Sequence, residues 1–455
     1  MGRNKRRGGG KGRATILPTK EKAAIHALLQ AGRITDAYAR CIALCQVVAN
    51  DGESWFILGH ISSRLGRHDD AIASYRRSLA VNPNIANAHY NLGCALNQTE
   101  RIVEAADAFR AAVKLNPAHA EACNSLGMVL VKLRNEKDGI KYLQKALSLR
   151  PDYQQARLNF SNAIDHAVPR WHFPMLNDET RNDTYDRAIR KAVNADSVVL
   201  DIGTGSGLLS MMAARAGAKH VYTFEGSVVI ADKAREIIAL NGFADKITVI
   251  ASMSTTASVG NELPGRANVM VSEIVDVGLL GEGLVQSNWH ARDHLLTADA
   301  TIIPRGAKVY AALVESPALY ADNHVHRAAG FDVEPFNEFS SVNYQQKRLQ
   351  HFPHTYLTEP FEVFSFDFTG APVTPDKATL EVNIIRDGLC HAVVMWFQLN
   401  LDDMDYIDSG PESRAHWMQG IQTFAQPLHV ERGQCAELAI EHDCTVILFT
   451  GMMLK

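Results

Sequence analysis

A glycine-rich loop is the first part of the sequence that could bind a ligand. The apolar run 197–202, which contains Asp201, is typical of a strand and leads straight into Gly203-Thr-Gly205-Ser-Gly207. Glycine lets a backbone turn tightly and lets a ligand approach it closely. Because Leu208 stands where a G-x-G-x-x-G loop has its third glycine, the spacing favours a cofactor other than a dinucleotide. Dinucleotide binding, or a turn that binds nothing, are the alternatives.

Glu225 directly follows the next strand-like run, 220–224. A carboxylate at the tip of the strand that follows a glycine loop can accept hydrogen bonds from both hydroxyls of a ribose. The loop and Glu225 together therefore predict a cofactor that contains a nucleoside.

Two glutamates, Glu273 and Glu282, lie nine residues apart in a turn-prone segment. Folded back on itself, this segment would turn both carboxylates into one pocket. Two carboxylates can bind a guanidinium, which is planar, permanently charged and rich in donors. The alternative is a pair of acids that face solvent.

These residues need a scaffold, and the sequence from about residue 195 predicts one. Strand-like runs (197–202, 220–224, 247–251, 269–271) alternate with helical patterns (208–216, 230–241). Such alternation indicates a parallel sheet with helices on both faces. After Pro304, runs typical of antiparallel strands predict a β-barrel or sandwich (308–314, 361–368, 379–385, 392–399, 444–450). Within it, 317–347 fits no strand pattern and is predicted to be an inserted, helix-compatible arm.

The first third of the chain repeats itself. Gly59, Gly93 and Gly127 are 34 residues apart, and prolines close each unit at the same period. A small residue at one fixed slot and a large one after it let two helices pack closely, so the pattern resembles the tetratricopeptide repeat. A degenerate unit precedes these three, and a helix at about 152–166 would cap the stack. Generic helical hairpins are the alternative.

Composition argues against a membrane-spanning protein, a general nucleic-acid binder and a protein held by disulfides. The chain has 455 residues, a formal net charge of −4 and no apolar run long enough to cross a bilayer. Residues 1–13 hold six Lys and Arg and no acid, which predicts a solvated basic tail. Beyond this tail, the sequence gives no strong signal for nucleic-acid binding. Seven cysteines without a C-x-x-C pair indicate reduced thiols and a cytoplasmic protein, and the basic tail favours the nucleus as the alternative in a eukaryote. The predicted organisation is a disordered tail (1–15), a repeat stack with its capping helix (16–168), a cofactor domain (169–304) and a β-barrel (305–455).

The sequence from about residue 170 to residue 455 resembles the protein arginine N-methyltransferases. D-x-G-x-G-x-G followed by Glu225 is similar to the loop of class I S-adenosylmethionine-dependent methyltransferases, and the Glu273–Glu282 segment is similar to the family's double-E loop. Met175, Leu176, Asp178 and Arg181 match the family's M-L-x-D-x-x-R helix. The resemblance implies that Arg181 binds the methionine carboxylate of the cofactor. It also implies that Met175 lies beside the substrate guanidinium.

Further matches extend this resemblance. Ala415-His416-Trp417 is similar to the T-H-W loop, with alanine in place of threonine. It implies that His416 bonds Asp178 and closes the pocket, and that Trp417 packs on the substrate's aliphatic stem. The remaining cofactor contacts that the resemblance implies are made by His172, Asp201, Gly203, Gly205, Gly207, Glu225, Ser254 and Thr255.

The resemblance implies methyl transfer from S-adenosylmethionine to a terminal guanidino nitrogen of a protein arginine, without a metal ion. Glu273, Glu282 and His416 are the expected catalytic residues, and Met175, Asp178 and Trp417 the expected substrate-binding residues. Asp276 and Ala415 favour monomethylarginine with some symmetric dimethylarginine. The resemblance also implies that the β-barrel serves substrate binding and dimerisation. A homodimer formed through the arm, and a protein partner on the repeats, are expected. The alternatives are an inactive repeat scaffold and an enzyme for a small guanidino metabolite.

Overall fold

The computed structural model describes residues 18–455, and the predicted basic tail lies outside them. The chain divides into two compact units, one ending at Ala167 and one spanning Val168–Lys455. Over the described residues, no helix combines the length and apolar character needed to span a bilayer.

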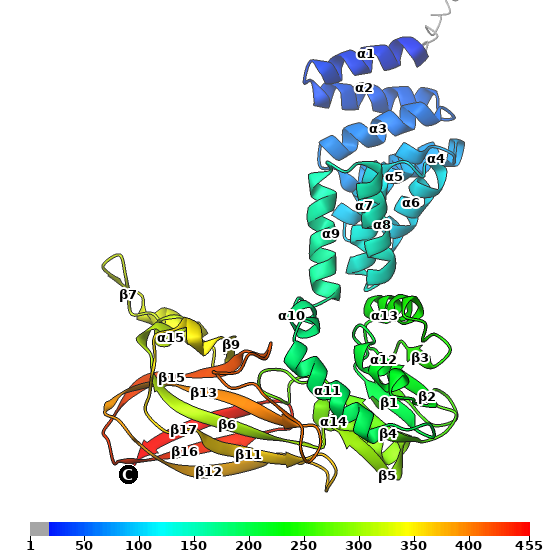
Figure 1. Cartoon of the computed structure of the whole chain (residues 1–455). Coiled ribbons are helices and arrows are strands. Elements are labelled where there is room, and N and C mark those ends of the chain that lie inside the picture. The colour runs from blue at the N-terminus through cyan, green and yellow to red at the C-terminus, as the bar shows by residue number, and fades with distance from the viewer. Residues whose placement is uncertain (1–17) are drawn as a thin grey trace, which may run out of the picture. The chain divides into compact units, whose positions relative to one another are not determined.

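The first unit consists of helices joined by short turns (Figure 1). The helices are α1 (Pro18–Gln30), α2 (Ile34–Val47), α3 (Gly52–Arg64), α4 (His68–Val81), α5 (Ala86–Gln98), α6 (Ile102–Leu115), α7 (Ala120–Lys132), α8 (Glu136–Leu149) and α9 (Gln154–Ala167). Consecutive helices pack on one another, so each buries its apolar stripe between neighbours.

The glycines of the repeat explain how closely the helices pair. A Cβ on Gly59 would lie 2.6 Å from the Tyr75 ring, and one on Gly93 would lie 2.6 Å from Phe109. A Cβ on Gly127 would lie 2.7 Å from Leu143. Any larger residue at these positions would separate the helices of a pair, which confirms the predicted small and large slots.

The cofactor domain of the second unit contains a parallel sheet in the order β3-β2-β1-β4-β5. Its strands are β1 (Val198–Ile202), β2 (His220–Phe224), β3 (Ile247–Ile250), β4 (Ala267–Ser272) and β5 (Leu296–Ile303). Its helices are α10 (His172–Leu176), α11 (Glu179–Ala192), α12 (Leu208–Arg215), α13 (Val228–Leu240), η1 (Ser254–Thr256), α14 (Leu284–His290) and η2 (Ala291–Leu295). The predicted alternation of strands and helices is confirmed.

Antiparallel strands form the rest of the second unit (Figure 1). They are β6 (Gly306–Glu315), β10 (Thr355–Tyr356), β11 (Phe361–Asp367), β12 (Asp376–Asn383), β13 (Gly388–Asn400), β14 (Tyr406–Asp408), β15 (Gln419–Val430), β16 (Cys435–His442) and β17 (Ile447–Leu454). One sheet runs β10-β6-β13-β15 and ends on a short strand of the arm, and β12-β16-β17 form a second. One apolar core runs from Val199 and Leu209 into barrel residues such as Val309 and Val393. The expected barrel is therefore confirmed, and its core is continuous with that of the cofactor domain.

The arm at 317–347 is less helical than its composition predicts. It contains α15 (Pro317–Ala321), β7 (Arg327–Ala328), β8 (Phe331–Asp332), η3 (Glu334–Phe339) and β9 (Gln345–Lys347). Ala329 and Gly330 both have positive φ, at 51° and 88°. Such a turn joins two antiparallel strands and interrupts a helix, which is why the helical expectation holds only for short pieces.

Candidate active site

Sheet topology brings the predicted site residues to one edge. Ile202, the last residue of β1, is in register with Phe224 on one side and Ser272 on the other. The glycine loop, Glu225 and Glu273 each follow directly on these three strand ends. The order β3-β2-β1-β4 changes direction between β1 and β4, and this is where open α/β sheets bind their ligands.

The glycine loop has a backbone that other residues would strain. Gly203, Gly205 and Gly207 have φ of 87°, 53° and 83°. A Cβ on Gly203 would also lie 2.5 Å from the Ile274 side chain. The loop therefore packs closely against the start of the double-E loop at Gly203, whereas the space beside Gly205 is open.

Glu225 is joined to this loop. One carboxylate oxygen accepts a hydrogen bond from Gly205 N at 3.0 Å, and the other accepts one from Ser227 N at 2.9 Å. Each oxygen keeps further acceptor capacity, so the carboxylate can still receive the two hydroxyls of a ribose.

Asp201 lies in β1, two residues before the glycine loop, and is completely buried. Its Oδ2 accepts hydrogen bonds from Ser210 at 2.5 Å and Thr223 at 2.9 Å. Burial raises the pKa of Asp201 to about 6, although these two hydrogen bonds oppose the shift. This enclosure makes Asp201 a support for the cofactor loop, with no exposed surface to offer a ligand.

Arg181 and Glu273 are in direct contact. Arg181 Nη2 donates to Glu273 Oε2 at 2.6 Å, and both side chains are at most 5% exposed. Arg181 also donates to Asn182 Oδ1 at 2.7 Å, but its buried Nε has no hydrogen-bond partner in the described part of the chain. A buried donor without a partner is costly, so Arg181 is able to bind a further anionic group such as the cofactor carboxylate.

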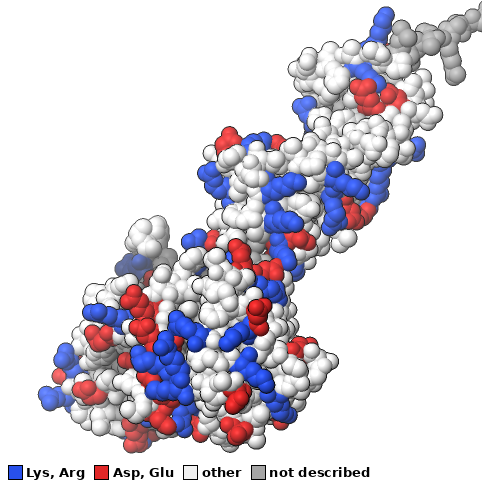
Figure 2. Space-filling model, turned by 45° about the vertical axis from the view of Figure 1, so that its right-hand side comes forward, with Lys and Arg blue, Asp and Glu red and all other residues white. Residues whose placement is uncertain are grey.

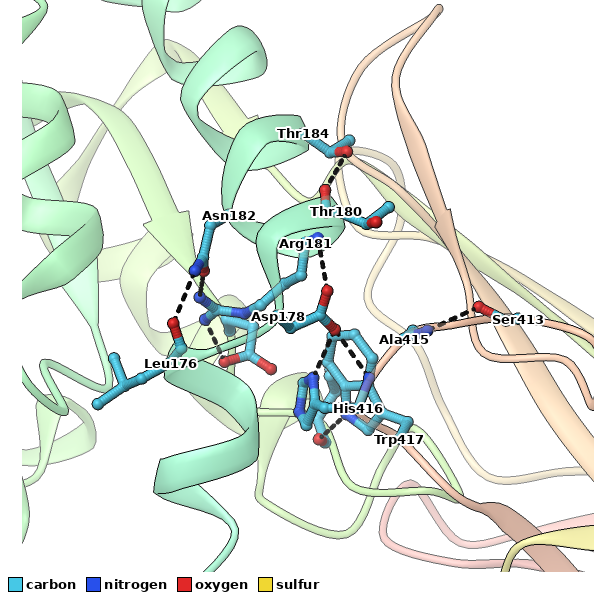
Figure 3. Close-up of polar contacts among 12 residues, drawn as sticks. Leu176, Asp178, Thr180, Arg181, Asn182, Thr184, Ser413, Ala415, His416 and Trp417 are labelled. Carbon is cyan, nitrogen blue, oxygen red and sulfur yellow. Dashed lines mark hydrogen bonds and ion pairs between the residues drawn. The ribbon is translucent and has the colours of Figure 1, made fainter.

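Asp178 links the start of α11 to the barrel (Figure 3). Its Oδ1 accepts from Arg181 N at 2.9 Å, which caps α11. Its Oδ2 accepts from His416 N at 2.7 Å and lies 3.1 Å from His416 Nδ1. Burial opposes the charge of Asp178, but hydrogen bonds from His416 and Arg181 outweigh it and hold the pKa of this carboxyl below its usual range. The expected contact between Asp178 and His416 is present.

Trp417 lies beside His416 and is 5% exposed. Its Nε1 donates to the backbone oxygen of Val275 at 3.1 Å, and its ring meets Phe397 edge-on at 5.3 Å. In this structure Trp417 thus supports the double-E loop. Met175 is also buried, at 6% exposure, at the end of α10.

Glu282 completes the double-E loop, which is residues 273–282. Desolvation, followed by repulsion from Glu273 and Asp276, raises the pKa of Glu282 from near 4.5 to about 7. Glu282 is nevertheless an exposed residue, so burial cannot account for the whole shift. Water then offsets part of the desolvation, and repulsion between neighbouring carboxylates remains the firmer cause of the upward shift.

The other expected cofactor residues are less closely joined to this group. His172 stacks on Trp171 at 3.9 Å, and its Nδ1 lies 2.9 Å from the Pro169 oxygen. Ser254 and Thr255 lie in η1, where Ser254 is buried. Their assignment to the cofactor stays a prediction.

Two tyrosines that hold the double-E loop were missed by sequence reasoning. Tyr185 of α11 donates to the Ser272 oxygen at 2.9 Å, and Tyr344 donates to Asp276 Oδ2 at 2.6 Å. Neither belongs to a motif, and the second is 68 residues from its partner. The sequence contained no signal that could have paired them.

Family models match three parts of the chain. A tetratricopeptide repeat model matches residues 56–120 and 100–154. A model of the ribosomal protein L11 methyltransferase matches 186–280, and one of the arginine methyltransferase oligomerization subdomain matches 305–445.

Several known proteins are similar in sequence. An arginine N(omega)-methyltransferase of Streptomyces achromogenes subsp. streptozoticus is 39% identical over 282 residues, 62% of this chain and 78% of that protein. Protein arginine N-methyltransferase 9 of Mus musculus is 33% identical over 317 residues, 62% of this chain and 37% of that protein. Protein arginine N-methyltransferase 7 of Drosophila ananassae is 34% identical over 315 residues, 59% of this chain and 46% of that protein. The chain spans less than half the length of the last two.

The fold also has a counterpart among solved structures. The Trypanosoma brucei PRMT1 enzyme-prozyme heterotetrameric complex with AdoHcy has a TM-score of 0.55 and 24% identity, over 61% of this chain and 89% of that one. The motif pattern resembles protein arginine methyltransferase 9 most and protein arginine methyltransferase 7 next, in agreement with these similarities. The chain therefore belongs to the protein arginine N-methyltransferase family, whose members depend on S-adenosylmethionine, and it carries tetratricopeptide repeats ahead of the catalytic unit.

Proposed function

We propose that this chain transfers a methyl group from S-adenosylmethionine to a terminal guanidino nitrogen of arginine in protein substrates. The observation that carries the proposal is the buried Glu273, which follows β4 beside the glycine loop and already holds a guanidinium, that of Arg181, at 2.6 Å. A site that accommodates one guanidinium in this geometry has the chemistry to bind another.

The residues present fit the cofactor. The three glycines have positive φ and the space beside Gly205 is open, Glu225 retains acceptors for a ribose, and the buried Nε of Arg181 lacks a partner within the described residues. Bound there, S-adenosylmethionine supplies an electrophilic methyl group.

The chain's own residues position the acceptor. Glu273 and Glu282 would each hold part of the substrate guanidinium, drawing its positive charge toward the nitrogens that they contact. The free nitrogen then has more electron density for attack, and its proton must leave after the methyl group is transferred. A carboxyl whose pKa is near 7, as for Glu282, is suited to accept that proton. His416 and Asp178 would hold α11 and the barrel together around this site.

The distribution of charge over the surface gives this proposal less support than the two local glutamates do. Basic and acidic side chains are mixed over the visible face of the chain (Figure 2). An acidic groove for a protein substrate is therefore not evident on that face, and recognition would rest on Glu273 and Glu282.

A transfer assay with isotopically labelled S-adenosylmethionine tests the proposal. The acceptors are a synthetic Gly-Gly-Arg-Gly-Gly peptide, protein substrates captured by the repeats, and free L-arginine. We expect label on peptide and protein, lost in Glu273→Gln and kept in the control Glu236→Gln, an exposed glutamate of α13. Label only on free L-arginine would point to a small guanidino substrate, and none on any acceptor would point to a scaffold.

The product is proposed to be monomethylarginine with some symmetric dimethylarginine. The support is the resemblance of Asp276 and Ala415 to the corresponding residues of members with these products. The Asp276 carboxylate itself turns toward the backbone of its own loop and Tyr344, so it acts on product choice through loop shape. Chromatography of hydrolysed product tests this, and a dominant asymmetric dimethylarginine peak would contradict it.

A homodimer is proposed as the working form. Phe336 and Phe339 of the arm are 66% and 78% exposed, with ring centroids 5.4 Å apart. This pair offers apolar surface that a second copy could bury, and the oligomerization model covers this segment. The arm would pack on the cofactor domain of a second copy as an isologous pair.

The compartment is proposed to be the cytoplasm, or the nucleus in a eukaryote. All seven cysteines are free thiols in the structure, as expected under reducing conditions.

A protein partner on the repeats is likewise proposed, supported by the match to the repeat model.

A further inference from the structure

Asp276 is the centre of the turn that separates the two glutamates. Its Oδ1 accepts hydrogen bonds from Gly278 N at 3.1 Å and Gly281 N at 3.0 Å, and its backbone oxygen accepts one from Leu279 N at 3.0 Å. A Cβ on Gly281 would lie 2.5 Å from Asp276 Oδ2. The turn therefore wraps tightly around this one carboxylate.

Within residues 18–455, Tyr344 makes the one further hydrogen bond to that carboxylate. Its hydroxyl donates to Asp276 Oδ2 at 2.6 Å, and a Cβ on Gly278 would collide with the same hydroxyl. Desolvation, with the charge of Asp276, raises the pKa of Tyr344 far above its usual value, so the hydroxyl remains a donor. A hydrogen bond to an ionised acceptor is about twice as strong as a neutral one.

The two halves of the double-E loop are held differently. Tyr185 donates to the oxygen of Ser272, the strand residue directly before Glu273, and Trp417 donates to the Val275 oxygen within the first half. The second half, which carries Glu282, is bound through Asp276. Leu279 and Leu280 are fully buried there, but apolar packing alone does not fix the direction of a neighbouring carboxylate.

Tyr344 lies at the root of the arm, by which we mean its two ends where they meet the barrel, residues 320–323 and 341–347. It directly precedes β9, and Asn323 joins the two sides of the root by accepting from Ser341 N at 3.0 Å and Gln345 Nε2 at 3.0 Å. Asn323 also donates to Thr423 of β15 at 2.9 Å. The arm residues between 323 and 341 include the exposed Phe331, Phe336 and Phe339. The same short root thus carries both the exposed aromatic surface and the contact to Asp276.

We propose that Tyr344 is a positioning residue for the arginine-binding loop: its hydrogen bond to Asp276 holds the half that carries Glu282 and couples this half to the inserted arm. The proposal rests on the proposed function, because it assigns Glu282 to the substrate guanidinium. A loop released from Tyr344 would sample more conformations, and fewer of them would present both carboxylates to one guanidinium.

Tyr344→Phe removes the hydroxyl and keeps the ring. We expect kcat/KM for the Gly-Gly-Arg-Gly-Gly peptide to fall roughly tenfold or more, as for loss of one hydrogen bond to a charged group. The affinity for S-adenosylhomocysteine should stay within about twofold, since the glycine loop and Glu225 are untouched. Tyr320→Phe is the matched control, because Tyr320 also lies at the arm root but donates to the Ala425 oxygen of the barrel at 3.1 Å.

A double-mutant cycle that combines Tyr344→Phe with Asp276→Asn tests whether Tyr344 and Asp276 act through their shared hydrogen bond. The asparagine oxygen can still accept from Gly278 and Gly281. If the bond carries the effect, the double variant should be no worse than the more impaired single variant. Fully additive losses would overturn the proposal.

Hydrogen exchange provides a readout that does not need turnover. Tyr344→Phe should speed amide exchange in residues 276–283, where Gly278 and Gly281 donate to Asp276, and Tyr320→Phe should not. Unchanged exchange and unchanged kcat/KM in Tyr344→Phe would overturn the proposal, as would an equal loss in Tyr320→Phe or an equal loss of S-adenosylhomocysteine affinity. If the wild-type chain methylates no acceptor, the proposed function has failed and the exchange experiment alone decides whether Tyr344 holds the loop.

Discussion

Arg181 and Glu273 form a buried ion pair with an N–O distance of 2.6 Å, although they are 92 residues apart. The pair joins the residue expected to bind the cofactor carboxylate to one expected to bind the substrate guanidinium. Each side chain therefore neutralises the charge of the other. A cofactor carboxylate would share Arg181, and a substrate guanidinium would share Glu273.

Glu273→Gln should reduce the stability of the ligand-free protein and abolish methyl transfer. It leaves the Arg181 charge buried without its partner, which typically costs about 3–5 kcal/mol in the free energy of unfolding. S-adenosylhomocysteine should raise the melting temperature of this variant more than that of the wild type, because its carboxylate replaces the lost anion. Glu282→Gln serves as the control, since Glu282 is repelled by its neighbours and should not destabilise the protein when neutralised. Turnover close to that of wild type in Glu273→Gln would show that the double-E assignment is wrong.

Methyl transfer should increase with pH through about 7. Glu282 must be ionised to hold a guanidinium, and its pKa is raised to about 7 in the absence of substrate. Stability should follow the opposite trend, because a carboxyl with a raised pKa in the folded state stabilises the protein fully below its unfolded pKa near 4.5 and loses that contribution as pH rises through 7. Unfolding midpoints of the wild type and Glu282→Gln across pH 4–8 measure the second effect. Two parallel curves would show that Glu282 does not titrate as described.

Glu225→Ala should weaken binding of S-adenosylhomocysteine and loosen the glycine loop, because Gly205 N and Ser227 N both donate to this carboxylate. Glu225→Gln retains one acceptor oxygen and should bind more tightly than the alanine variant. Calorimetric titration of the two variants separates these cases. Equal affinity of wild type and Glu225→Ala would remove Glu225 from the cofactor site.

The arm should control association of the chain. Replacing both Phe336 and Phe339 with serine should convert a dimer into a monomer at micromolar concentration, measured by light scattering. Met404→Ser is the control, because Met404 is 80% exposed on a barrel loop outside the arm. A wild-type chain that is monomeric and fully active would contradict the proposed dimer.

Gly93→Ala should destabilise the repeat unit by about 1–3 kcal/mol, as expected for overpacking. The added Cβ would lie 2.6 Å from the Phe109 ring, so the two helices of the pair must separate. Adding Phe109→Leu, which reproduces the leucine that faces Gly127 in the next repeat, should recover part of this loss. Urea denaturation followed by circular dichroism measures both effects, and an unchanged midpoint in the single variant would rule out the close packing.

The sequence by itself determined every feature that depends on local spacing. A 34-residue period predicts the helical pairs because each Gly must face a large side chain in the next helix, as Gly93 faces Phe109. The glycine register of the cofactor loop could be predicted because three positive φ angles exclude most other residues. Matches to family motifs placed Asp178 and His416 in one site before any geometry was known.

Tertiary structure alone decided which of these side chains are engaged and how. Arg181 meets Glu273, and Tyr344 meets Asp276, only because sheet order and the arm root bring distant segments together. No periodicity or motif records such contacts, since their partners are set by the path of the whole chain. For the same reason the turn at Ala329 and Gly330, which makes most of the arm non-helical, was not visible in its composition.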